Sequence, residues 1–153
     1  MIAMRPIVMR SILFASIALL ICTVAAAAKD KPLGEMQQEA QSASLKERPK
    51  LYIKIAQAQL RLADKSFSAG NSASAQVAVE NVTEFATKAA DAAIQSGRKL
   101  KDTEIDIRKM ADKLRDIKRN LNFDDQAPVE RSRDKLEDLR GKLLTSMFTK
   151  KKK

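Results

Sequence analysis

The sequence predicts an all-α protein, an antiparallel four-helix bundle built from two αα-hairpins after an N-terminal signal segment. The clearest observation is an apolar stripe in residues 103–122, whose members recur at steps of three and four. They are Ile107, Met110, Leu114, Ile117 and Leu121. This spacing places them on one face of an α-helix, and three neighbouring segments carry similar stripes. Only 4% of the residues are aromatic, and the chain has four glycines and four prolines, which favours closely packed helices with short connections.

Residues 1–28 have the organisation of a signal peptide. Arg5 and Arg10 precede an uncharged run over residues 11–28, and the small residues at its end match the A-x-A arrangement that signal peptidase accepts. We expect cleavage near Ala28 and export to the periplasm or the extracellular space. The alternative is an uncleaved membrane anchor formed by residues 11–28, whose length is at the lower edge of a membrane span.

Cleavage would change the chemistry of the mature chain. Cys22 is the one cysteine, so its removal leaves neither a thiol nor a disulfide, and stability has to come from packing. Arg5 and Arg10 would also leave. The mature chain would then hold 27 basic residues against 19 acidic ones, and its formal charge would be +8 instead of +10.

Residues 29–47 are polar and mixed in charge, and we expect a flexible leader with at most a helical turn around residues 35–43. Ser44 and Glu47 have the spacing of a capping box, and Pro49 suits the first turn of a helix. A long helix is therefore predicted to begin near residue 49.

The first hairpin is predicted to pair helices at about 49–69 and 72–96. Gly70 can close the first helix in the left-handed conformation, and Ser72 or Ser74 can cap the second. Many apolar positions of the second helix are alanines, which allow close packing but bury little area. We therefore expect Phe85 to be the most sensitive position of this hairpin.

The third helix is predicted at about 101–122. Thr103 is placed to cap it, and acidic residues follow in the first turn, where they oppose the positive end of the helix dipole. Glu104 and Arg108 are four residues apart and are expected to form an ion pair on a solvated face.

The fourth helix is predicted at about 128–148, with Pro128 at its first position after a break over residues 122–127. Phe123 is expected to fold back onto the end of the bundle. The four helices define a bundle domain over residues 48–149, followed by a basic tail over residues 150–153.

The sequence lacks most of the residues and motifs that common catalytic sites use. The chain has no histidine, which removes the usual general base, the commonest metal ligand and the Ser-His-Asp and Cys-His triads. Asp124 and Asp125 lack calcium-loop spacing and are interpreted as the entry to the last helix. The glycines are isolated, so no phosphate-binding loop is predicted. We expect no enzyme, cofactor or metal site.

Two groups of basic residues are the positive indication of a partner. The candidate anionic-surface contacts are Arg98, Lys99, Lys101, Lys150, Lys151, Lys152 and Lys153. Such groups attract lipid headgroups and polysaccharide through salt-sensitive forces. Nucleic acid is disfavoured, because no aromatic residues lie among them to stack on bases. The competing interpretation is that these charges only keep the protein soluble.

We therefore expect an exported, non-catalytic protein-interaction or structural module whose partner is another envelope or secreted protein. The alternative is an electrostatic binder of anionic envelope components, either lipid headgroups or polysaccharide. Apolar stripes with this spacing also suit an intermolecular coiled coil, so self-association stays open. An exposed apolar patch would favour the first function, and lysines clustered at one end would favour the second.

Overall fold

The computed structural model describes the backbone of residues 31–150 and the side chains of residues 31–149. This part of the chain forms five helices: α1 (Leu33–Ser42), α2 (Arg48–Ser68), α3 (Ser72–Ser96), α4 (Leu100–Arg119) and α5 (Phe123–Lys150). No strand occurs among these residues, and the prediction of an all-α protein is confirmed. The expected signal segment, residues 1–28, and the tail residues 151–153 lie outside the described residues.

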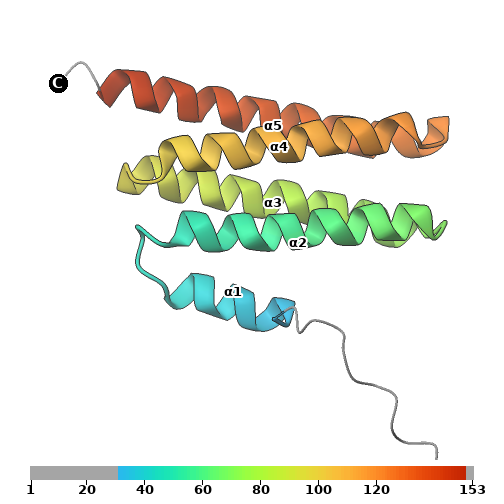
Figure 1. Cartoon of the computed structure of the whole chain (residues 1–153), viewed down its shortest axis with the longest axis horizontal. Coiled ribbons are helices and arrows are strands. Elements are labelled where there is room, and N and C mark those ends of the chain that lie inside the picture. Colours follow the sequence, from blue (N-terminus) through green and yellow to red (C-terminus); the bar gives the residue numbers. More distant parts are fainter. Residues whose placement is uncertain (1–30, 151–153) are drawn as a thin grey trace, which may run out of the picture. The chain divides into compact units, whose positions relative to one another are not determined.

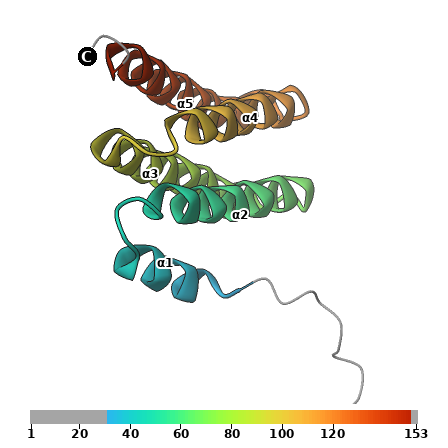
Figure 2. The same ribbon diagram turned by 60° about the vertical axis from the view of Figure 1, so that its left-hand side comes forward.

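The helices pack mainly in sequential pairs. α2 packs most extensively against α3, and α4 against α5, while α3 also contacts α5 and α1 contacts α2. Figures 1 and 2 show the chain reversing direction at each short connection, so that α2 to α5 lie alongside one another. Among the described helices, none has the length and hydropathy that a membrane span requires.

The core is formed by the predicted apolar faces. The largest fully buried side chains are Pro49, Ile55, Val79, Val82, Ile107, Met110, Leu114, Val129, Leu136, Leu139 and Leu143. α3 adds mainly small residues, including the buried Ala75, Ala78, Ala86, Ala89, Ala90 and Ala93. Small side chains let the α2 and α3 backbones approach closely, so the few large side chains of this pair provide most of its buried apolar area.

The turn between α2 and α3 ends α2 as expected. Gly70 has a φ of 74°, the left-handed conformation that glycine adopts without steric cost. The predicted serine cap is wrong, because the Asn71 side chain accepts a hydrogen bond from the Ser74 backbone N–H at 3.2 Å. The Ser72 hydroxyl instead donates to the Asp125 carboxylate at 2.9 Å, which links the starts of α3 and α5.

The segment expected to be a flexible leader contains a helix of ten residues, α1. Ala40 is fully buried, and Leu33 and Met36 pack against the same core. These three residues repeat the steps of three and four that mark the other helices. The segment is polar on average, but this short stripe gives it an apolar face that packs on α2.

The start of α2 confirms one prediction and corrects another. Pro49 lies in the first turn, as expected. The capping box, in which the serine and glutamate side chains would each accept a hydrogen bond from a backbone N–H, does not form. The Ser44 hydroxyl donates to the Glu47 carboxylate at 3.2 Å instead, and Glu47 makes no side-chain cap to the helix. The Arg48 guanidinium donates to the Ala43 carbonyl at 3.0 Å, which fixes the connection between α1 and α2.

Helix α4 begins before the predicted cap. Lys99 is the N-cap residue, and the Thr103 backbone N–H donates to the Lys99 carbonyl at 2.8 Å to close the first turn. Thr103 is itself buried inside the helix, so its predicted capping role is wrong. Gly97 has a φ of 65° and ends α3 in the left-handed conformation, as Gly70 ends α2.

Helix α5 begins earlier than expected, because residues 123–127 are helical and Pro128 lies inside the helix. Asp125 stabilises this early start in two ways. Its negative charge lies in the first turn, near the positive end of the helix dipole, and its carboxylate accepts the hydrogen bond from Ser72. Pro128 gives up one backbone hydrogen bond near the helix start. Phe123 is 87% exposed, so the prediction that it folds back is wrong.

Candidate functional site

The basic residues singled out in the sequence lie around one end of the helices. Arg98 and Lys99 occupy the connection between α3 and α4, Lys101 lies in the first turn of α4, and all three are exposed. Lys150 is the last residue of α5. Its side chain and the tail residues Lys151, Lys152 and Lys153 lie outside the described part of the chain. Figures 1 and 2 place the α1–α2 connection, the α3–α4 connection and the C-terminal end of α5 at the same end of the helices.

The structure adds three lysines that the sequence analysis missed. Lys46, Lys50 and Lys54 line a groove of about 550 Å³ together with Lys99. We call this feature the lysine groove. Its wall is formed by the end of α1, the connection after it and the first turns of α2, with Leu51 among the lining residues. Arg98 and Lys101 do not line it.

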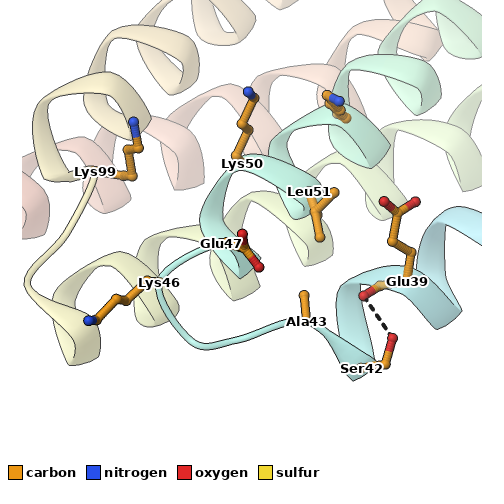
Figure 3. Close-up of a pocket in the computed structure, with 9 residues that line it drawn as sticks. Glu39, Ser42, Ala43, Lys46, Glu47, Lys50, Leu51 and Lys99 are labelled. Carbon is orange, nitrogen blue, oxygen red and sulfur yellow. Dashed lines mark hydrogen bonds between the residues drawn. The ribbon is translucent and has the colours of Figure 1, made fainter.

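The charges of the lysine groove are only partly balanced. Four lysines and two glutamates, Glu39 and Glu47, give its lining a formal charge of +2. Lys99 forms an exposed ion pair with Asp102 at 3.4 Å. The other three lysines of the groove form no ion pair within residues 31–149. Figure 3 shows the amino groups of Lys50 and Lys99 directed to the same side.

A smaller cavity of about 240 Å³ adjoins the lysine groove. Lys50 and Lys99 line both spaces, and the smaller one extends to the buried side chains Ile53 and Thr103. Asp106 also lines it. Burial raises the pKa of Asp106, Lys109 opposes the shift, and Asp102 adds to it through charge repulsion.

An ion pair to a buried carboxylate lies elsewhere and joins α4 to α5. The Arg140 Nε donates to the Glu104 carboxylate at 2.6 Å, and Glu104 is only 7% exposed. Arg140 also donates to Glu137 at 3.2 Å, and these two hydrogen bonds raise the pKa of Arg140. The predicted pair between Glu104 and Arg108 is therefore wrong. The reason is that Glu104 faces α5 rather than solvent.

Four large apolar side chains are exposed within the described residues: Leu62, Val77, Phe123 and Phe148. Phe148 is 67% exposed in the last turn of α5, two residues before Lys150. It therefore places an aromatic ring at the end of the helices that carries the basic connections.

The side chains that line the lysine groove are mainly charged. Within the described residues, no three potential metal-ligating side chains lie together. Asp125 is engaged by Ser72, and Asp124 is exposed in the first turn of α5. What the lysine groove offers chemically is a set of ammonium groups around an open space, which suits an anionic ligand.

Comparison with known proteins gives no relative: no family model, no curated protein and no solved structure matches the chain.

Proposed function

We propose that this is an exported protein that binds anionic phospholipid surfaces through the basic end of its helices. The observation that carries the proposal is the gathering of both basic connections and the C-terminal end of α5 at one end. Four exposed lysines, Lys46, Lys50, Lys99 and Lys101, come from these two connections and the helix turns beside them. Each basic residue near an anionic membrane contributes about 1 kcal/mol, so several acting together support measurable binding.

Phe148 favours a lipid surface over polysaccharide as the anionic component. Its ring is 67% exposed, and in the sequence it precedes the basic tail by two residues. An aromatic ring next to lysines can enter the interfacial region of a bilayer while the charges stay with the headgroups. A hydrated polysaccharide offers no comparable apolar layer.

Export and architecture form part of the same proposal. The sequence pattern of residues 1–28 supports cleavage near Ala28 and release from the cytoplasm, which would deliver the chain to an envelope surface. The helix pairings support an antiparallel four-helix bundle of α2 to α5, with α1 as an added helix on α2. The helices would then serve as a rigid support for the basic end.

A second proposal, a non-catalytic protein-interaction module, has its own supporting observation. Leu62 is 46% exposed on α2, and Val77 is 58% exposed on α3. Large apolar side chains in such positions can contact an envelope or secreted partner. Replacing both with serine should abolish binding to that partner and leave vesicle binding unchanged.

Vesicle sedimentation tests the first proposal. The protein is expressed from the full-length sequence, purified as the cell processes it, and mixed with phosphatidylcholine vesicles with or without phosphatidylglycerol. We expect binding only when phosphatidylglycerol is present, and we expect it to fall between about 50 mM and about 500 mM salt because exposed charges are screened.

The variant for this test removes the predicted contacts outside the lysine groove. It ends at Thr149 and carries Arg98→Gln and Lys101→Gln. The matched control removes the same number of charges from exposed sites along the helices, at residues 61, 65, 109, 113, 131 and 135. Binding should fall strongly in the first variant and little in the control. Equal loss in both, or no binding of the parent protein at low salt, would refute the proposal.

A further inference from the structure

The lysine groove contains a placement of charge that is unfavourable for the helix that carries it. Lys50 and Lys54 are one helical turn apart on α2, so their like charges lie on one face and repel each other. Lys46 lies in the connection before the helix. Lys50 is in the first turn of α2, where the helix dipole is positive, and this turn contains no acidic residue. Nothing in the described part of the chain forms an ion pair with these three lysines.

Lys99 completes the cluster from the other connection. Among the described residues, it is the one non-glycine residue with a positive φ, 61°. A lysine in this left-handed conformation is strained, and the structure holds it where its side chain lines both the lysine groove and the smaller cavity. Lys50 lines the same two spaces, so these two lysines stand where the spaces join.

We propose that the lysine groove binds one phosphate-bearing headgroup, with its phosphate held between Lys50 and Lys99. The proposal rests on the proposed membrane function and names the lipid group that is recognised. A ligand phosphate adds negative charge to the first turn of α2, where the one acidic neighbour is the N-cap residue Glu47, and it relieves the repulsion between Lys50 and Lys54. Charged residues at positions that destabilise a helix are expected where a binding site requires them.

The size and lining of the groove indicate the kind of headgroup. A space of about 550 Å³ lies within the usual range for small-molecule sites. Lysines act as point charges that suit phosphate, and an arginine fork for a carboxylate is absent from this lining. Asp102 and Asp106 in the adjoining cavity can accept hydrogen bonds from hydroxyl groups. These features fit a glycerophosphate group with free hydroxyls.

The test is a titration of the ¹⁵N-labelled protein followed by NMR, with the protein expressed from the full-length sequence and purified as the cell processes it. The two probes are glycerophosphodiesters of equal charge: glycerophosphoglycerol, which is soluble, and short-chain phosphatidylglycerol below its micelle concentration. We expect saturable shifts of backbone amides in residues 46–54 and 99–106. Tighter binding of the lipid probe would identify a lipid headgroup as the source, and equal binding would identify a soluble phosphate ester.

A pair of matched variants separates the groove from general charge. Lys50→Gln with Lys99→Gln removes two groove lysines, and Arg98→Gln with Lys101→Gln removes two charges from the same end outside the groove. The first pair of substitutions should raise the Kd for each probe at least about tenfold, and the second pair should raise it less than about twofold. Circular dichroism melts check that both pairs stay folded, and shift mapping on the unsubstituted protein tests the site without any variant.

The outcomes distinguish this inference from the proposed function. Equal weakening by both pairs, or absence of saturable shifts with both probes, would overturn the groove as a site even if vesicle binding is present. Saturable binding in the groove without vesicle binding would support the site and overturn the membrane function.

Discussion

Replacing Phe85 with alanine is expected to be among the most destabilising single changes in α3. Phe85 is 6% exposed and lies in the interface with α2, where its ring stacks on Tyr52 with centroids 6.3 Å apart and planes at 29°. The Lys88 amino group lies 4.9 Å from the centroid of the Phe85 ring. The substitution removes the ring and both of these contacts.

The expected loss of unfolding free energy is about 3 to 5 kcal/mol, the range for removing a buried phenylalanine side chain. Two features place the loss toward the upper part of that range. The neighbours of Phe85 on α3 include many alanines, whose short side chains cannot extend into the space that the ring leaves. The stacked pair with Tyr52 adds about 0.5 to 1.5 kcal/mol beyond area burial. For a domain of this size the melting temperature should fall by about 12 to 20 °C.

Thermal and urea unfolding followed by circular dichroism measure this loss. Phe123→Ala is the matched control, because the same ring is removed from a side chain that is 87% exposed, and its effect should stay within about 0.5 kcal/mol. A loss below about 1 kcal/mol for Phe85→Ala, or equal losses for the two variants, would refute the packing argument for α2 and α3.

Two further predictions concern charged groups. Arg140→Ala should lower the melting temperature more than Arg108→Ala at neutral pH, because only the first leaves the buried Glu104 carboxylate without its ion-pair partner; equal melting temperatures would contradict the pairing. Asp106→Asn should raise the melting temperature at pH 7. Burial raises the Asp106 pKa above 3.8, so the folded state binds the proton more tightly, and stability falls as pH rises through the folded pKa. The gain should vanish below about pH 3.8, where the carboxyl is neutral in both states, and melts at both pH values check this.

The candidate site was only partly predictable from the sequence. Arg98, Lys99 and Lys101 form a cluster that is visible in the chain, and the structure confirms their exposure. Lys46, Lys50 and Lys54 have a visible spacing of four, but such a pattern usually marks a solvated helix face. Their meeting with Lys99 depends on how the helix pairs bring two connections to the same end.

Single residues at the helix ends also divide into those that the local sequence predicts and those that depend on distant contacts. Gly70 and Gly97 were predictable, because the left-handed conformation is a local property of the backbone that glycine favours. The serine cap failed because Ser72 finds a partner on α5, Asp125, that no local pattern contains. Glu104 likewise binds Arg140, which is thirty-six residues away in the chain, rather than the nearby Arg108.

The sequence by itself determined the all-α class, the apolar faces of the four long helices, the glycine ends of α2 and α3, and the excess of basic residues. Each of these follows from periodicity, backbone preference or composition, which are properties of a segment taken alone. Tertiary structure decided the burial of α1 on α2, the early start of α5, the exposure of Phe123, the partner of Glu104 and the lysine groove. Those depend on which faces and ends meet, and their energies come from contacts between segments far apart in the chain.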